Sequence, residues 1–289
     1  MEPREIVVVG TVRSVAKNIF KNVTALVNEF KPLGNIYFFL VESDSDDNTL
    51  IELNRLSQKF PNFSFVSLGN IRNEIPDRVE RLIFCRNRYI QEIRSRKVFR
   101  ESQYIFIIDL DNSNNHLKAN NIEISLKSEG NWGGLFANQK GRYYDILALR
   151  HPIWCPNSVL EEIYWYSNSI SKPKAKKLAT YNRMIRLPAQ SGLIPVQSAF
   201  GGFAVYKTKH LLNHDYTPAM KDNSVDIDHV ILNRKIINSG SFLYIDSQLL
   251  NCNWTSHSLQ YYRIYRVYLH WKKRLFYWSK RLHSLFKKV

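Results

Sequence analysis

The sequence Tyr104-Ile105-Phe106-Ile107-Ile108-Asp109-Leu110-Asp111-Asn112 joins an uninterrupted apolar run to two aspartates spaced two residues apart. Such a run is typical of a strand buried on both faces inside a parallel sheet. On an extended chain this spacing places both carboxylates on one side, about 7 Å apart at Cα. Open α/β sheets bind ligands beyond the carboxyl ends of their strands. The stretch therefore predicts that Asp109 and Asp111 hold Mg²⁺ or Mn²⁺ beside a phosphorylated ligand. A simple Asp/Asn turn is the alternative interpretation.

Strands and amphipathic helices alternate before this stretch. We expect strands at 6–10, 35–41 and 63–68, and helices at 14–30, 50–60 and 79–97. This alternation is typical of a parallel, doubly wound α/β sheet, which we predict for residues 1–112. The first helix has its apolar residues on one face, at Val15, Ile19, Val23, Leu26 and Phe30.

The pattern is looser after residue 112. We expect a strand at 132–138, a strand-like segment at 144–150, and a further strand region at 196–207 that contains a double glycine. A helix at 226–239 and a strand at 242–246 follow. The simplest division is one domain over residues 1–258, with a nucleotide-binding half at 1–112 and a sugar and acceptor half at 113–258, and then a separate helix at 259–289.

The last thirty-one residues carry a strong positive charge. The whole chain has a formal net charge of +16, and residues 259–289 contain no Asp or Glu. Their apolar residues recur at steps of three and four along one helix face: Tyr261, Ile264, Tyr268, Trp271, Leu275, Trp278, Leu282 and Leu285. Aromatic residues flanked by lysine and arginine favour a helix lying in the plane of an anionic membrane surface. Docking on the protein itself or on a second subunit is the alternative. Nucleic acid is not expected, because phosphate binding does not require so regular a stripe.

Cysteine usage and the start of the chain bear on its location. Cys85, Cys155 and Cys252 have unrelated spacings that indicate neither a disulfide framework nor a metal knuckle. The first residues, 1–6, include two glutamates where a signal peptide would need a basic patch and an apolar run. No segment approaches eighteen uninterrupted apolar residues. We therefore expect a cytoplasmic protein, peripheral on the inner face of a membrane.

Polar loops follow three of the expected strands on the same sheet edge. Acids there suit the donor groups of a ribose or a base, and arginine suits phosphate. No glycine-rich dinucleotide motif or P-loop is present, so a diphosphate would need a metal and arginines to neutralise its charge. The residues that we predict to bind a nucleotide are Thr11, Arg13, Glu42, Asp44, Arg86 and Arg88.

Other candidates lie in the second half. Gly201 and Gly202 stand between aromatic residues, which allows the backbone to approach a flat ligand such as a sugar, or marks a kinked strand. Asp226 and Asp228 open a helix, where one is a candidate catalytic base and helix capping explains the other. His257 follows the last strand and is a candidate third metal ligand, although a lone histidine is usually structural.

In their order, these pieces resemble the GT-A glycosyltransferase fold. More closely, Tyr143-Tyr144-Asp145-Ile146-Leu147-Ala148-Leu149-Arg150 resembles a signature of the fungal capsule-associated α-1,3-mannosyltransferase family. The segments 41–49 and 84–88 also match that family's pattern. The resemblance extends over about residues 6–257 and leaves out the basic tail.

The resemblance implies a metal-dependent glycosyltransferase that moves a sugar from a nucleotide-sugar donor to a glycan or lipid-linked acceptor in surface-glycan synthesis. It places Asp109 and Asp111 at the metal and the donor diphosphate, and Asp145 and Arg150 in the donor-sugar pocket. Asp226-Ile227-Asp228 and the Phe-Gly-Gly loop depart from the family's pattern, so the acceptor and the sugar stay open. A nucleotidyltransferase of similar α/β build is the enzymatic alternative. A basic lipid-binding or nucleic-acid-binding module is the non-enzymatic one.

Overall fold

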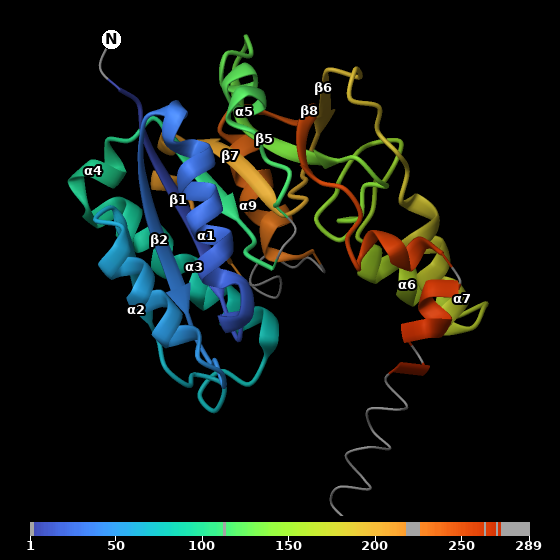
Figure 1. Cartoon of the computed structure of the whole chain (residues 1–289). Helices are drawn as coiled ribbons and strands as arrows, with labels where there is room; N and C mark the ends of the chain where they lie inside the picture. Colours follow the sequence, from blue (N-terminus) through green and yellow to red (C-terminus); the bar gives the residue numbers. More distant parts are fainter. Residues whose placement is uncertain (1–2, 112–113, 218–225, 263, 270, 273–289) are drawn as a thin grey trace, which may run out of the picture.

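We describe the protein from a computed structural model, which covers residues 3–111, 114–217, 226–262, 264–269 and 271–272. One eight-stranded sheet crosses the molecule in the order β3-β2-β1-β4-β7-β5-β8-β6, with helices on both faces (Figure 1). Its strands are β1 (Glu5–Val12), β2 (Asn35–Glu42), β3 (Phe63–Ser67), β4 (Tyr104–Ile108), β5 (Trp132–Gln139), β6 (Leu193–Val196), β7 (Phe203–Lys207) and β8 (Phe242–Cys252).

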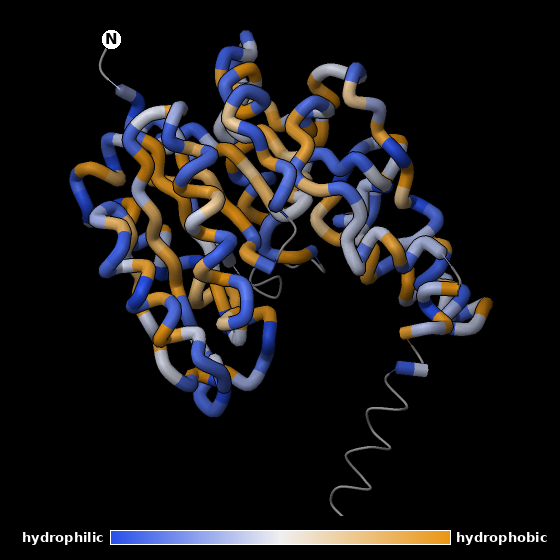
Figure 2. The backbone as a smooth tube through the Cα atoms, in the orientation of Figure 1, coloured by the Kyte–Doolittle hydropathy of each residue, from blue (hydrophilic) through white to orange (hydrophobic). Residues whose placement is uncertain are grey.

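The first four strands pair in parallel, as the sequence predicts. Successive residues of β1 face opposite sides: Ile6 and Val8 belong to one buried cluster, and Val7 and Val9 to the other. Helix α1 (Ala16–Phe30) supplies Ile19 and Val23 to the first cluster, whereas α3 (Arg78–Ser95) packs on the second. The sheet is therefore buried on both faces, and Figure 2 shows its strands as the most apolar part of the trace.

The remaining helices are shorter. They are α2 (Thr49–Lys59), α4 (Lys97–Arg100), α5 (Ala119–Leu126), α6 (Val159–Ser167), α7 (Lys172–Ala179), α8 (Thr208–Leu212) and α9 (Asp228–Asn238), with 3₁₀ turns η1 (Lys31–Leu33), η2 (Tyr181–Arg183) and η4 (Ser258–Tyr261). The expected helices at 14–30, 50–60, 79–97 and 226–239 correspond to α1, α2, α3 and α9.

Two expectations for the second half were wrong. Residues 144–150 form turns instead of a strand, joined to the sheet region by an isolated bridge between Arg150 and Ser198. The expected strand at 196–207 is divided into β6 and β7 by a loop in which Gly201 and Gly202 have φ values of +70° and +88°. Strand β7 then inserts antiparallel between β4 and β5, which carries the sheet into the second half of the chain.

The basic tail is only partly covered by the described residues. Residues 264–269 and 271–272 are helical, as predicted, and the rest of the predicted helix, 273–289, lies outside the described residues. Three residues of the predicted apolar stripe are exposed here: Ile264 by 81%, Tyr268 by 55% and Trp271 by 56%. None of the helices in the described part of the chain combines the length and the apolar character needed to cross a membrane.

Candidate functional site

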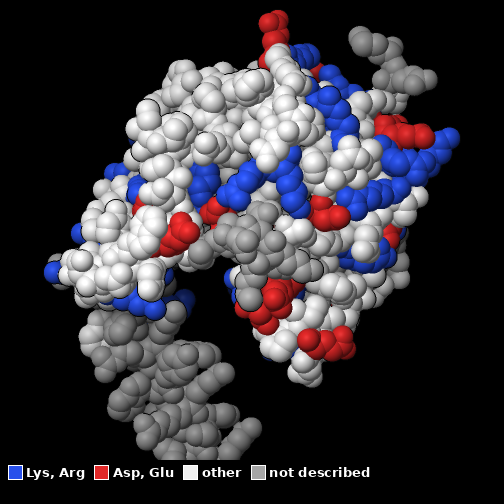
Figure 3. All heavy atoms as spheres, turned by 180° about the vertical axis from the view of Figure 1, so that it is seen from behind, with Lys and Arg blue, Asp and Glu red and all other residues white. Residues whose placement is uncertain are grey.

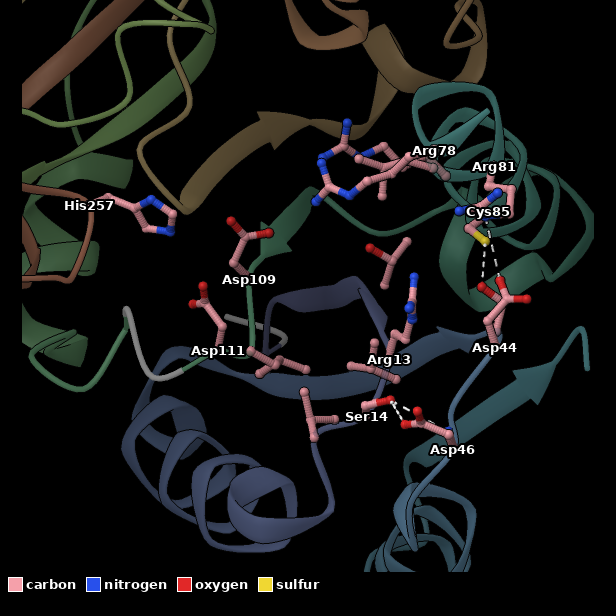
Figure 4. A pocket seen from close by; sticks show the side chains of 17 residues that line it. Arg13, Ser14, Asp44, Asp46, Arg78, Arg81, Cys85, Asp109, Asp111 and His257 are labelled. Atoms are coloured by element: carbon pink, nitrogen blue, oxygen red, sulfur yellow. Dashed lines mark hydrogen bonds and ion pairs between the residues drawn. The ribbon is translucent and has the colours of Figure 1, made fainter. Parts of the chain in front are cut away.

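A cavity of about 720 Å³ opens at the carboxyl ends of β1, β2 and β4. The loops after these strands and one face of α3 line it, and His257 closes it on the side of the second half (Figure 4). Seven of the residues predicted from sequence line this one cavity: Thr11, Arg13, Asp44, Arg86, Asp109, Asp111 and His257.

Asp109 and Asp111 stand at the end of β4, as the buried-strand interpretation requires. Their carboxyl groups project to the same side, toward His257 (Figure 4). Burial raises the pKa of Asp109 to about 7, and the nearby charge of Asp111 adds to the shift while Arg86 opposes it. Two carboxylates placed this close repel each other, and a divalent cation with oxygen ligands would relieve that repulsion.

The donor set here consists of two carboxylates. Among the described residues, no three His, Cys, Asp or Glu side chains come together as a metal-binding group. The ring of His257 instead stacks on Tyr144, with centroids 5.6 Å apart. The residues present thus fit a cation that takes its further ligands from a bound diphosphate, as Mg²⁺ usually does in phosphate sites.

Arginines face the carboxylates across the cavity. Arg13 follows β1, and Arg78, Arg81 and Arg86 lie on α3. Sequence reasoning missed Arg78 and Arg81, although their spacing of three places them on one helix face. Asp77 caps this helix by accepting hydrogen bonds from the backbone N–H of Val79 and Glu80. Several guanidinium groups opposite two carboxylates are chemically suited to a metal diphosphate.

The two acids at the end of β2, Glu42 and Asp44, are held by contacts with other residues of the protein. Asp44 lines the cavity in the left-handed conformation at φ +56°, and its carboxylate accepts a hydrogen bond from the Arg72 backbone N–H at 2.9 Å. The Nε of Arg81 lies 3.7 Å from the other carboxylate oxygen. Glu42 is buried outside the cavity and accepts hydrogen bonds from the Ser67 hydroxyl and the Ser45 N–H. The Arg81 guanidinium also donates hydrogen bonds to the Ile75 and Pro76 carbonyls at 2.6 and 2.7 Å, so Asp44 and this backbone together hold it, and Glu42 fixes the loop.

Arg86 and Asp228 form a buried ion pair that joins the two halves of the chain. Asp228 is 4% exposed at the first turn of α9. Burial alone would raise the pKa of Asp228, but the charge and hydrogen bond of Arg86 together with contributions from His229 outweigh it, and the pKa is lowered. The carboxylate is consequently ionised and directed at a guanidinium that lines the cavity.

Asp226 and Arg150 lie at a different cavity, of about 460 Å³. Arg150 Nε donates to Asp226 Oδ1 at 3.0 Å, and Arg234 donates to Oδ2 at 2.6 Å. The structure thus separates Asp226 from Asp228, which sequence spacing had grouped as alternatives. Arg88 also lies outside the first cavity, because its guanidinium pairs with Glu92 on the same helix at 2.5 Å.

Gly201 and Gly202 pack against neighbouring parts of the protein. The carboxylate of half-buried Asp145 accepts from the Gly201 N–H at 3.0 Å, and the Gly202 carbonyl accepts from the Asp109 N–H at 2.9 Å. A Cβ at Gly201 would lie 2.9 Å from the Ala137 carbonyl oxygen. Asp145, Gly201 and Gly202 therefore support the end of β4 and do not line the first cavity.

Solved glycosyltransferase structures resemble the chain in fold. The mannosyltransferase PcManGT from Pyrobaculum calidifontis, in complex with GDP-Man and Mn²⁺, matches with a TM-score of 0.50 and 12% identity over 87% of this chain and 57% of that chain. The chain has the GT-A fold. S. aureus TarS 1–349 matches with a TM-score of 0.44 and 13% identity, over 92% of this chain and 65% of that one.

The galactosyltransferase LgtC, in complex with donor and acceptor sugar analogs, matches with a TM-score of 0.43 and 9% identity, over 86% of this chain and 73% of that one. This GT-A chain spans 57% of the length of the Pyrobaculum mannosyltransferase and 65% of TarS. No protein-family model and no curated protein sequence matches it.

Proposed function

We propose that this chain is a metal-dependent glycosyltransferase that transfers a sugar from a nucleotide-sugar donor to an acceptor. One observation carries the proposal: Asp109 and Asp111 share a cavity with Arg13, Arg78 and Arg81 at the carboxyl edge of a GT-A sheet. Carboxylates suit a cation and arginines suit phosphate, so the cavity matches a metal-bound nucleoside diphosphate on both counts. Its volume of about 720 Å³ is in the range of small-molecule sites.

The residues have separate roles in this mechanism. Asp109 and Asp111 would hold Mn²⁺ or Mg²⁺, which supplies positive charge to the departing diphosphate. Arg13 and Arg78, with exposed side chains at the cavity, bind the phosphate oxygens and so stabilise the same leaving group. The Arg81 guanidinium, held by Asp44 and by the Ile75 and Pro76 carbonyls, adds positive charge at the same cavity.

A catalytic base is needed if the reaction inverts the sugar configuration, and Asp228 is our first choice. Its pairing with Arg86 favours the ionised carboxylate, which can accept a proton but is weakly basic. Arg86 would therefore have to move toward the diphosphate before Asp228 accepts the acceptor's proton. Asp226, held by two arginines at the other cavity, is the second choice.

The acceptor that we propose is a glycan or lipid-linked glycan in surface-polysaccharide synthesis, reached at an anionic membrane surface on the cytoplasmic side. The exposed apolar residues Ile264, Tyr268 and Trp271 support attachment through residues 259–289. Replacing Tyr268 and Trp271 together by Glu should release the protein from anionic vesicles.

We also propose kinship with the fungal capsule-associated mannosyltransferases, on the signature at residues 143–150. Two signature residues make internal contacts in this chain, because Asp145 holds Gly201 and Arg150 holds Asp226. A role for Asp145 or Arg150 in binding the donor sugar would therefore require these internal contacts to rearrange or a bound substrate to engage them. The proposal of a mannosyl donor depends on the same condition. Donor identity is best found by direct binding.

Thermal denaturation with a panel of nucleotides and sugar nucleotides, each with and without Mn²⁺, tests the proposal. A ligand at one hundred times its Kd stabilises the fold by about 2.7 kcal/mol, so the true donor class should raise Tm only when the metal is present. Asp111→Ala should abolish this metal-dependent rise, whereas Asp215→Ala, at an exposed carboxylate elsewhere, should preserve it. A metal-dependent rise in Asp111→Ala would refute the metal assignment. Release of pyrophosphate from a nucleoside triphosphate would indicate a nucleotidyltransferase instead.

A further inference from the structure

A second, apolar groove lies between α6 and α7, on the lobe next to the C-terminal segment. Its volume is about 550 Å³, and two lysines from α7 stand at it. The apolar side chains that line it are Leu147, Leu160, Ile163 and Tyr164, and the lysines are Lys172 and Lys176. Leu147 lies two residues after Asp145, and Asp145 supports the glycine loop beside the first cavity. We call this first cavity the donor cavity, because the proposed nucleotide-sugar donor would bind there. The groove thus lies next along the chain to the residue that supports the end of β4.

Helix α6 exposes three consecutive aromatic side chains. Tyr164, Trp165 and Tyr166 are exposed by 69%, 53% and 38%, and only Val159 and Glu162 of this helix are buried. Tyrosine and tryptophan favour the boundary between water and lipid because each ring has an apolar body and a polar group. The exposed face of α6 is therefore suited to the interfacial region of a bilayer.

The two charged side chains that line the groove, Lys172 and Lys176, are both positive. The acidic residues of α6, Glu161 and Glu162, do not line it, and Glu162 pairs with Arg183. Residues 163–186 contain six Lys and Arg and no Asp or Glu. Four of them are exposed on α7: Lys172, Lys174, Lys176 and Lys177. Lysines near a membrane surface attract anionic headgroups, and their long side chains allow the charge to reach the phosphate while the stem covers apolar surface. This charge pattern complements an anionic lipid.

The start of the tail lies next to the groove, on the other side of Tyr181. The guanidinium of Arg266 lies 4.8 Å from the ring centroid of Tyr181, and Lys176 lies 5.8 Å from the same ring. Tyr181 also donates a hydrogen bond to Gln260. Figure 1 accordingly shows the described part of the C-terminal helix beside α6 and α7. The exposed residues of both regions belong to one lobe.

We propose that the α6–α7 groove binds an anionic membrane phospholipid, with an acyl chain between Leu160 and Ile163 and the headgroup phosphate at Lys172 and Lys176. The α6–α7 face and residues 264–269, 271 and 272 then form a single membrane-binding surface. This surface would hold the donor cavity at a constant height above the bilayer, where a lipid-linked acceptor is available. The inference extends the membrane attachment proposed above and requires no transferase activity.

Site-specific fluorescence on the full chain tests lipid contact directly. The three native cysteines are buried, so a cysteine introduced as Tyr164→Cys can be labelled selectively with an environment-sensitive dye such as NBD. Ile51→Cys, at a 57% exposed position on α2, is the matched control. With vesicles containing phosphatidylglycerol, the dye at 164 should increase several-fold in emission and shift to the blue, and the dye at 51 should not change. Vesicles of phosphatidylcholine alone should have little effect on either.

Charge-reversal variants provide the second test of the proposal. Lys172→Glu with Lys176→Glu should weaken partitioning onto phosphatidylglycerol vesicles at least about tenfold. Lys17→Glu with Lys21→Glu, an equal charge change at exposed positions on α1, should have a much smaller effect.

Two results would overturn the proposal. In the first, the protein binds vesicles while the dye at 164 stays in water, which would assign binding to the tail alone. In the second, the dye responds to protein concentration without lipid, which would assign the face to a second copy of the chain. Each of these results is independent of sugar transfer, so the groove proposal and the proposed function can fail separately.

Discussion

The guanidinium of Arg86, on α3, pairs with the carboxylate of Asp228, on α9, across 142 residues of sequence. Both side chains are more than nine-tenths buried, and Arg86 also lines the donor cavity. The pair therefore joins the two halves of the molecule beside the site where we expect the diphosphate. Any change to one partner leaves a buried charge uncompensated.

A double-mutant cycle should detect this coupling. Arg86→Gln and Asp228→Asn should each reduce the free energy of unfolding by about 3–5 kcal/mol, and the double variant should lose much less than the sum. Denaturant unfolding measures all three values. The exposed pair Arg94–Asp215, at 2.8 Å, is the control and should give a coupling energy below about 1 kcal/mol. Additive losses at Arg86 and Asp228 would contradict a buried ion pair.

Arg78 should contribute to affinity for the donor diphosphate. Its side chain is exposed at the cavity, so Arg78→Ala removes a charged donor with little effect on the fold. A hydrogen bond to a charged group is worth about 1.5–3 kcal/mol, which predicts a loss of roughly tenfold to a hundredfold in affinity for a nucleoside diphosphate. Isothermal titration calorimetry would measure it. Arg88→Ala, on the same helix but outside the cavity, should bind as tightly as the unmodified chain.

Gly201→Ala should lower the stability of the fold through a steric clash. Gly192 is the control that separates this clash from backbone strain. Gly201 and Gly192 both have φ +70°, so alanine is strained at either position. A Cβ at Gly201 also meets the Ala137 carbonyl oxygen at 2.9 Å, whereas one at Gly192 meets nothing within 4 Å. We expect a loss of roughly 1 kcal/mol at Gly192 and 2–4 kcal/mol at Gly201, from thermal unfolding. Equal losses would mean that the loop is not packed against β5.

His229 should make the fold less stable in acid. Its ring is buried, stacks on Phe200 at 4.1 Å, and has no hydrogen-bond partner on either nitrogen within the described residues. Burial lowers its pKa to about 3, with Arg86 acting in the same direction. The unfolded chain, with a pKa near 6.5, takes up a proton that the folded chain excludes, so stability falls as pH drops from about 6.5 toward 3.

His229→Phe should remove this pH dependence. The variant should become more stable relative to the unmodified chain by up to about 1.4 kcal/mol for each pH unit below 6. Urea unfolding at pH 7, 6 and 5 measures the difference. Parallel pH profiles would show that the folded protein accommodates a protonated His229.

Much of the first half was predictable because its signals are local. The buried run at 104–108 and the alternation of strands and helices before it depend on side-chain periodicity, which can be read directly from the sequence. A parallel sheet then brings the carboxyl ends of its strands to one edge, so Thr11, Arg13 and Asp109 could be grouped without coordinates. The spacing of Arg78 and Arg81 was an available signal of the same kind.

The second half was less predictable because non-local contacts determine it. Residues 144–150 have the alternation of a strand, yet they form turns because Asp145 binds Gly201 and Arg150 bridges to Ser198 and Asp226. The segment at 196–207 breaks because Gly201 must approach β5 closely. Nothing in the local pattern of either segment indicates these partners.

The sequence by itself thus determined the parallel half of the sheet and the edge at which its acids and arginines meet, because strand order and periodicity are properties of neighbouring residues. Tertiary structure alone decided which acids face the cavity. Asp111 is directed into it, Asp226 is bound by Arg150 and Arg234 at another cavity, and Asp228 holds Arg86. These carboxylates are chemically alike, and their roles differ because their charged partners come from distant parts of the chain, where folding sets the distance and the burial that fix each ion pair.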